Sequence, residues 1–141
     1  MTSTKILLVD DEQAITANLS PFLERAGFAV TVAADGEEAL RQVGGSGPDL
    51  IVMDIEGSEF FALSGMPEIL AKSRHLQMEY IADHLDKVSA VSNEELLGLL
   101  SPHFGCVRLQ PDGDLVRRDD FLAFLDRLRA DEISGDLLFS K

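Results

Sequence analysis

The sequence has little of several residue types that mark particular classes of protein. It contains one cysteine, Cys106, among 141 residues, which excludes an internal disulfide and any metal cluster held by cysteines. We interpret Cys106, in the stretch FGCVRL, as a small buried strand residue rather than a reactive thiol. The three histidines, His75, His84 and His103, lie far apart in the sequence and show no metal-ligand spacing.

Basic residues and long hydrophobic runs are also scarce. The chain has 12 Lys and Arg against 25 Asp and Glu, so its formal net charge is −13. A field of that sign repels nucleic acid and anionic membrane surfaces, and we expect neither as a partner. The apolar run in the N-terminal stretch MTSTKILLVDDE is too short for a signal peptide, and no later run approaches bilayer length. We therefore expect a cytoplasmic protein.

Apolar strand-like runs alternate with amphipathic stretches, and 45% hydrophobic residues are enough for one sizeable core in a single domain, residues 1–141. We predict strands over 5–9, 28–33, 49–54, 75–81, 105–110 and 136–140, and helices over 12–27, 36–44, 59–73, 92–104 and 118–130. Strand–helix–strand units force parallel pairing with right-handed crossovers. The predicted fold class is α/β, a three-layer α/β/α sandwich with a doubly wound, mainly parallel sheet.

Several residues predict where the helices begin, break or end. Gly27 should stop the first helix, and Pro21 should kink it or restart it after Ser20. The connection over 59–73 should be interrupted near Gly65 and Pro67. Ser92 or Asn93, followed by Glu95, is a capping signal for the next helix. The apolar face of the first helix is expected in the core: Ile15, Leu19, Phe22, Leu23 and Ala26.

Three carboxylates follow strands that we expect to be neighbours. Asp10 and Asp11 come after the first strand, and Asp54 ends the third. Parallel strands deliver these side chains to the carboxyl edge of the sheet, where such folds bind ligands. Carboxylates this close repel unless a proton or a hard cation intervenes, and Mg²⁺ is the natural occupant. The alternative is that Asp11 and Asp54 merely cap the helices that follow.

Two glutamates lie on the connection after the third strand. Glu59 and Glu68 could both be exposed to solvent, which is what we expect of most such residues, or Glu59 could face the acidic pocket formed by the three aspartates.

The motifs KILLVDDE, AGFAVTVAADGEEAL and PDLIVMDI resemble the receiver domain of two-component response regulators over residues 4–55. This resemblance implies that Asp54 is the phosphoacceptor. It also implies that Asp10 and Asp11 hold Mg²⁺ and that the backbone carbonyl of Glu56 lies close to a further ligand position. The Asp54 carboxylate would attack an activated phosphoryl group while the metal neutralises charge on its oxygens.

Two features of that family do not recur after Ile55. The fourth strand runs into EYIADH, where the only hydroxyl is that of Tyr80, in place of a Ser or Thr beside Ala. The fifth strand ends in LQP, with Gln110 where the family has a lysine. The chain therefore lacks the cation that pairs with the phosphoryl group and the hydroxyl that senses it, so signal output is not expected.

Residues 54–141 have a second resemblance. DIEGSEFFALSGMPEIL, the strand HLQMEYI and the tail GDLLFSK are similar to the C-terminal half of the FkbM-type methyltransferases, which use S-adenosylmethionine. That family carries its glycine-rich cofactor loop in the N-terminal half, which is not present. The glycine cluster GGSGP, residues 44–48, follows a helix and precedes a strand, so we read it as a helix stop and a loop. No S-adenosylmethionine binding is expected.

The two resemblances meet at residues 53–56 and lead to the hypothesis of an engineered chimera, with a receiver-like half over 1–54 and a methyltransferase-like half over 55–141. Methyltransferase topology implies the sheet order 2-1-3-4-6-5, with the last strand antiparallel between the fourth and the fifth. Such a chimera would be neither an enzyme nor a signalling protein, with no obligate protein partner, and would be a monomer or weak homodimer. It could retain Mg²⁺ at Asp10, Asp11, Asp54 and the Glu56 carbonyl.

Three other functions stay open. One is an atypical response-regulator receiver domain, phosphorylated on Asp54 in a two-component phosphorelay. Another is a small methyltransferase, which the missing cofactor loop disfavours. The last is a purely structural protein whose acidic pocket has no metal affinity.

Overall fold

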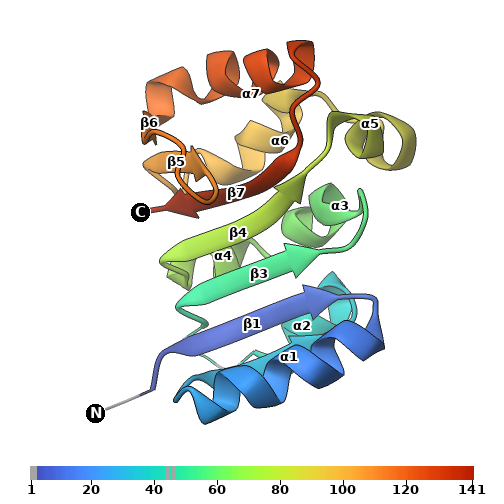
Figure 1. Cartoon of the computed structure of the whole chain (residues 1–141), viewed down its shortest axis with the longest axis vertical. Coiled ribbons are helices and arrows are strands. Elements are labelled where there is room, and N and C mark those ends of the chain that lie inside the picture. The colour runs from blue at the N-terminus through green and yellow to red at the C-terminus, as the bar shows by residue number, and fades with distance from the viewer. Residues whose placement is uncertain (1–2, 44, 46) are drawn as a thin grey trace.

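The computed structural model describes residues 3–43, 45 and 47–141, and a single seven-stranded sheet runs through it (Figure 1). Gly44 and Ser46 of the predicted loop over 44–48 lie outside the described residues. The strands are β1 (Lys5–Asp10), β2 (Ala29–Ala33), β3 (Leu50–Asp54), β4 (His75–Tyr80), β5 (Cys106–Leu109), β6 (Val116–Arg117) and β7 (Gly135–Ser140). The α-helices are α1 (Gln13–Arg25), α2 (Gly36–Gln42), α3 (Glu59–Ser64), α4 (Pro67–Lys72), α5 (Ala82–His84), α6 (Asn93–Leu100) and α7 (Phe121–Ala130). A π-helical turn, Leu85–Ser89, follows α5, and a 3-10 turn, Arg118–Asp120, precedes α7.

The strand order is β2-β1-β3-β4-β7-β5-β6, which confirms the predicted α/β class. β1 pairs in parallel with β2 and β3, and β3 pairs in parallel with β4. β7 lies antiparallel between β4 and β5, as predicted for the last strand. The order differs from the prediction only by β6, a two-residue strand that forms a hairpin with β5. So short a strand has no hydrophobic periodicity by which the sequence could reveal it.

One face of the sheet is closed by five helices and contains the main core. The side chains on this face are fully buried along the strands: Leu7, Val9, Ile51, Met53, Leu76, Met78, Val107, Leu137 and Phe139. They pack with buried residues of α2, α3, α4, α6 and α7. The other face is covered at β1, where α1 packs and where Ile6 and Leu8 are 4% and 2% exposed. The three layers of the predicted sandwich are therefore complete only at the β1 end.

Helix α1 differs from the prediction in two ways. Ile15, Leu19 and Phe22 are 42%, 37% and 61% exposed, because α1 packs mainly on β1 and β2 and has no extensive contact with another described helix. Pro21 lies inside the helix without ending it, so of the two effects predicted for it, a kink or a restart after Ser20, the restart does not occur. Pro21 and the turn before it are exposed, so water can bond the carbonyl that proline leaves without a helical donor.

The other helix boundaries follow the sequence signals. Gly27, with φ +102°, ends α1 in the left-handed conformation that glycine adopts most readily. The connection after β3 is broken between α3 and α4, and Pro67 opens α4. Ser92 is the N-cap of α6, where it forms a complete capping box with Glu95.

Two glycines provide a matched test of the packing between α2 and α3. A Cβ atom at Gly36 would lie 2.8 Å from Cα of Ala62, a backbone atom that cannot move aside, whereas a Cβ at Gly98 in α6 meets nothing within 4 Å. We expect Gly36→Ala to lower the free energy of unfolding by about 1–3 kcal/mol. Gly98→Ala should raise it by about 0.5–1 kcal/mol, because alanine is the better helix former. Urea denaturation of both variants checks the signs, and equal effects would contradict the close approach of α2 and α3.

Candidate functional site

Two of the predicted aspartates meet where β1 and β3 end. Asp10 is the last residue of β1 and pairs in register with Asp54, the last residue of β3. Both side chains are half-buried, and Asp11, the next residue, is exposed. The parallel pairing of the two strands thus brings the first and third predicted carboxylates to the carboxyl edge of the sheet.

Asp11 and Asp54 do not cap the helices that follow them, as the alternative required. The N-cap residue of α1 is Glu12, without a side-chain capping bond, and that of α3 is Ser58. Asp10 instead accepts a hydrogen bond of 2.8 Å from the backbone N–H of Glu12, which fixes the turn between β1 and α1. The Asp54 carboxylate therefore has no helix-capping role.

Two further acids, which the sequence did not single out, extend the site across the sheet. The last pair between β3 and β4 is Met53 with Met78, so the next residues, Asp54 and Glu79, lie side by side. Asp136 of β7 pairs with Glu79. Asp10, Asp54, Glu79 and Asp136 therefore form a row across four neighbouring strands, which we call the acidic row. Adjacent strands lie about 4.8 Å apart, so these carboxylates act on one another. The signal that could have revealed Glu79 is its place at the end of a strand next to that of Asp54.

Burial and neighbouring acids both act on Asp54. Burial raises the pKa of its carboxyl group, and the negative charges of Asp10, Asp136 and Glu56 raise it further. The same causes act on Glu79, since burial raises its pKa first and the charge of Asp54 adds to the effect. The acidic row therefore holds unbalanced negative charge, which favours a cation.

The structure also places the residues that stand where the family has a hydroxyl and a lysine. Tyr80 is fully buried, and its hydroxyl donates a hydrogen bond of 2.7 Å to Asn93 Oδ1 in the core. Gln110 follows β5, which β4 and β7 separate from β3. The strand beside β4 is β7, and it brings the acid Asp136 to the edge where a lysine was missing.

Glu59 is buried, so the expectation that it is exposed is wrong. Glu59, the first residue of α3, is only 2% exposed, whereas Glu68 on α4 is exposed. Burial raises the pKa of the Glu59 carboxyl group, and hydrogen bonds from its own backbone and that of Gly57 oppose the rise. The negative charge of Asp54 adds to the increase.

Glu59→Gln is expected to flatten the pH dependence of stability. A carboxyl group whose pKa is raised in the folded state binds more protons than in the unfolded state. It therefore costs stability as the pH rises from the ordinary glutamate pKa through the raised one. The melting temperature of the variant should fall less than that of the wild type over this range. Glu68→Gln, at an exposed position, should follow the wild-type profile, and a Glu59→Gln profile parallel to the wild type would refute the assignment.

The loop after β3 holds the predicted backbone ligand. Glu56 has a φ of +52° and Gly57 a φ of +97°, so the chain turns sharply as it leaves Asp54. A Cβ atom at Gly57 would lie 2.9 Å from the carbonyl oxygen of His84. Ser89 donates a short hydrogen bond to the carbonyl of Gly57. The turn is therefore fixed by the segment that follows β4.

The donor atoms at this edge fit Mg²⁺. The described residues contain no group of three or more His, Cys, Asp or Glu side chains able to hold a metal ion by themselves. Mg²⁺, however, binds through one or two carboxylates and retains several waters. Asp10 and Asp54, in register on neighbouring strands, supply that number of oxygen ligands. The fit rests on this donor chemistry and on the unbalanced negative charge.

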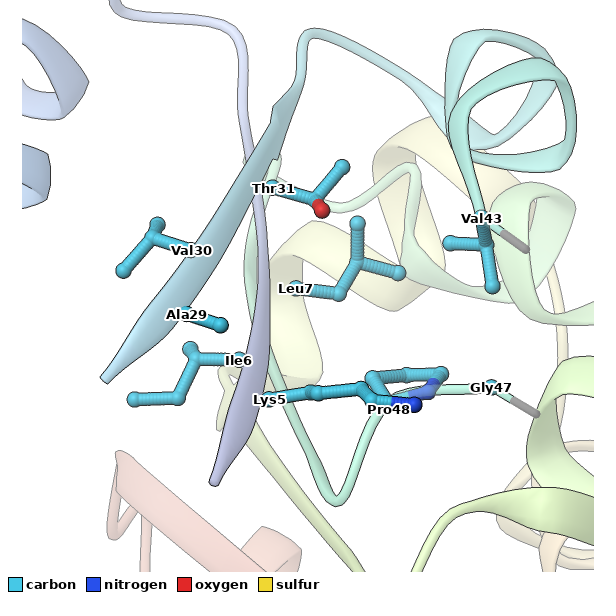
Figure 2. Close-up of a pocket in the computed structure, with 9 residues that line it drawn as sticks. All are labelled: Lys5, Ile6, Leu7, Ala29, Val30, Thr31, Val43, Gly47 and Pro48. Atoms are coloured by element: carbon cyan, nitrogen blue, oxygen red, sulfur yellow. The ribbon is translucent and has the colours of Figure 1, made fainter. Parts of the chain in front are cut away.

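A separate surface cavity of about 310 Å³ lies at the opposite edge of the sheet (Figure 2). It opens at the amino-terminal ends of β1 and β2, and Figure 2 shows Leu7, Thr31 and Val43 around it. Its lining is mainly apolar and includes no acid. The cavity is therefore distinct from the acidic row and carries none of its chemistry.

Comparison with known proteins decides the family. The family model of the response regulator receiver domain matches residues 6–86, which is more than half of the chain. The chain belongs to the response regulator receiver domain family. This receiver domain is 53% identical over 51 residues to the alkaline phosphatase synthesis transcriptional regulatory protein PhoP of Bacillus subtilis. It is 46% identical over 55 residues to the transcriptional regulatory protein PrrA of Mycobacterium tuberculosis.

These relatives are much longer than the chain. The matches cover 36% of this chain and 21% of PhoP, and 39% of this chain and 24% of PrrA. Among solved structures, the chemotaxis response regulator CheY4 of Vibrio cholerae is 31% identical, with 46% of this chain and 57% of that chain covered and a TM-score of 0.39. No helix in the described part of the receiver domain is long and apolar enough to cross a membrane.

The extent of the family match bears on the chimera hypothesis. Residues 6–86 run past the junction at 53–56 and include β4 and α5, and they end inside the π-helical turn. The comparisons support the receiver domain, which was the alternative to the chimera, and they give no support to an engineered origin or a methyltransferase half.

Proposed function

We propose that this receiver domain accepts a phosphoryl group on Asp54 within a two-component phosphorelay. The observation that supports the proposal most directly is the pairing of Asp10 with Asp54 at the carboxyl edge of two parallel strands. In that arrangement one carboxylate would act as the nucleophile, and its neighbour, which accepts one hydrogen bond from the Glu12 backbone, would help to bind a cation. The family of the chain adds to this support.

In the proposed step, a carboxylate oxygen of Asp54 attacks the phosphorus of the donor. A new P–O bond forms, and the bond from phosphorus to the leaving oxygen breaks, with the electron pair departing on that oxygen. Asp10 and Asp11, with Asp54 and the Glu56 carbonyl, would hold Mg²⁺, which supplies positive charge for the phosphoryl oxygens. Only the ionised carboxylate can attack, and burial, together with the neighbouring acids, raises the pKa of Asp54 and so disfavours that form.

The neighbourhood of Asp54 distinguishes this proposal from ordinary signalling. Asp136 occupies the edge beside β4, so a phosphoryl group on Asp54 would lie near another negative charge. The charges that act on the Asp54 carboxylate among the described residues are those of acids, and no lysine is one of them. We infer that phosphorylation is coupled only weakly to a change of shape, and we assign the domain neither enzymatic activity nor an obligate protein partner. A cytoplasmic location is part of the same proposal.

A two-stage experiment tests this function. Amide NMR spectra of the ¹⁵N-labelled protein are recorded alone, with Mg²⁺, and with Mg²⁺ plus beryllofluoride, which mimics a bound phosphoryl group. Shifts should concentrate at residues 10–11 and 54–57. Incubation with acetyl phosphate and Mg²⁺ should then add the mass of one phosphoryl group, and peptide mapping should place it at Asp54. Unchanged spectra together with an unchanged mass would refute the proposal.

A second candidate is the chimera with a methyltransferase half over residues 55–141. The antiparallel β7 between β4 and β5 favours it, because that strand order was expected from the methyltransferase resemblance. Neither the family match nor the relatives support it. We expect no binding of S-adenosylmethionine by isothermal titration calorimetry, and binding at micromolar concentration would revive this candidate.

A further inference from the structure

One face of the sheet is left open over its central strands. Leu50 and Val52 of β3, Gln77 of β4 and Leu138 of β7 point to this side, according to the strand register. We call these four residues the open face. All four are only half-buried. Their neighbours on the same strands that point to the other side, such as Ile51 and Leu137, are 0% exposed. On one side these strands are therefore covered by the packed core, and on the other side they are partly exposed to solvent.

The arrangement of the helices explains the difference. In Figure 1 the arrows of β3, β4 and β7 face the viewer, and no described helix lies in front of them. Helix α1 is on this side of the sheet but packs on β1 and β2. Its exposed Ile15, Leu19 and Phe22 recur at i, i+4 and i+7, so they form one apolar stripe. Two surfaces on the same side of the molecule, the open face and α1, therefore lack apolar cover.

Charge is distributed unevenly over the same side: Arg108 of β5 is in register with Leu138, and the acids lie together at the carboxyl ends of β1, β3 and β4 and at the start of β7. Side chains two residues apart on a strand point the same way, so Asp54 lies on the side of Val52 and Asp136 on that of Leu138. The acidic row therefore borders the open face at one end. A molecule that covers the open face must place either positive charge or buried water against these carboxylates. A binding partner of the open face is therefore expected to carry basic residues at the end that meets the acidic row.

We propose that the open face docks an amphipathic helix of a partner protein, with its apolar stripe on Leu50, Val52 and Leu138 and its basic residues against the acidic row. Charge complementarity selects this occupant, because a second copy of the chain would bring another net charge of −13 and a second acidic row. A helix suits the site because these strands are paired on both edges and offer only their face.

This docking does not depend on phosphorylation of Asp54. The main core on the other face is closed without a partner, so the interaction is reversible rather than required for folding. The proposed function concerns the chemistry of one carboxylate, whereas docking concerns apolar contact over three strands. Either can fail while the other holds.

The first test uses model helices with the complete chain, in buffer without Mg²⁺. A synthetic Leu/Lys peptide of about 18 residues, with leucine at i, i+3, i+4 and i+7, is titrated into the ¹⁵N-labelled protein. Two matched peptides replace every lysine by glutamate or every leucine by serine. The Leu/Lys helix should shift the amides of Val52, Gln77 and Leu138. Both matched peptides should bind at least about tenfold more weakly, since each lacks one of the two interactions.

Variants of the protein separate the open face from general charge attraction. Leu138→Lys and Leu122→Lys add the same charge, but Leu122 is 36% exposed on α7 at the opposite side of the sheet. Leu138→Lys should weaken the Leu/Lys peptide about tenfold or more, and Leu122→Lys should change its affinity less than about twofold. Gln77→Lys replaces a polar residue of the open face, so it should fold normally and also weaken binding.

Several results would overturn the proposal. Equal losses in Leu138→Lys and Leu122→Lys, or equal binding of the Leu/Lys and Ser/Lys peptides, would mean attraction by net charge alone. Amide shifts confined to another surface would place the site elsewhere. A dimer in analytical ultracentrifugation that Leu138→Lys dissociates would mean that a second copy, not a basic helix, covers the open face.

Discussion

Asp54→Asn is expected to abolish phosphoryl incorporation from acetyl phosphate and, at the same time, to raise the melting temperature at neutral pH. The first effect follows because an amide is not a nucleophile for this step. The second follows because burial and neighbouring acids raise the pKa of Asp54, so its ionised form costs stability. That cost grows as the pH rises from the ordinary aspartate pKa through the raised one, and asparagine removes it. Intact-protein mass spectrometry and thermal unfolding at several pH values measure the two effects.

Glu79→Gln is the matched control for this prediction. Glu79 lies next to Asp54 in the acidic row, and its pKa is raised by the same causes, burial first. The variant should also be more stable at neutral pH but should still incorporate a phosphoryl group. Loss of incorporation in both variants would mean that the row acts as a unit, without a single nucleophile. A lower melting temperature in Asp54→Asn would contradict the sign of the electrostatic effect.

Phe139→Ala is expected to lower the free energy of unfolding by about 3–5 kcal/mol, the usual cost of truncating a buried phenylalanine. Phe139 of β7 is 0% exposed. Its ring packs edge-on against Phe121 at a centroid distance of 5.6 Å and lies 6.0 Å from Phe104. The substitution removes all of these contacts and leaves a cavity between β7 and α7. Urea denaturation monitored by circular dichroism gives the loss.

The control is the same substitution at an exposed position. Phe22 in α1 is 61% exposed, and Phe22→Ala should change the free energy of unfolding by less than about 0.5 kcal/mol. Equal effects of the two substitutions would mean that β7 does not lie in the core between β4 and β5. This comparison therefore tests the strand order as well as the packing of one side chain.

The strands and the first part of the site could be predicted because their signals are local. Continuous apolar runs such as KILLV identify buried parallel strands, and the alternation of strands with helices determines their parallel direction. From these two facts it follows that Asp10 and Asp54 meet at one edge of the sheet. The prediction that β7 lies between β4 and β5 had a different basis. It was drawn from the methyltransferase resemblance and not from any pattern in residues 135–140.

The remaining features depend on contacts between distant segments. Asp136 reaches the acidic row only because β7 runs antiparallel to β4, and residue spacing does not reveal strand direction. Glu59 looks like any charged residue in the first turn of a helix, and its burial depends on what packs around α3. The apolar stripe of α1 predicts a buried face, but whether another helix covers that face is a property of the whole fold.

The place of β7 in the sheet has a consequence for the newly made chain. β7 is the last strand in chain order, yet it joins β4 to the hairpin of β5 and β6. Until residues 135–140 have left the ribosome, β4 presents an unpaired edge and β5 is paired only with the two residues of β6. Unpaired strand edges recruit other strands, so the nascent protein is exposed to mispairing until synthesis reaches β7. Chaperones that shield strand edges would matter most for this protein during that interval.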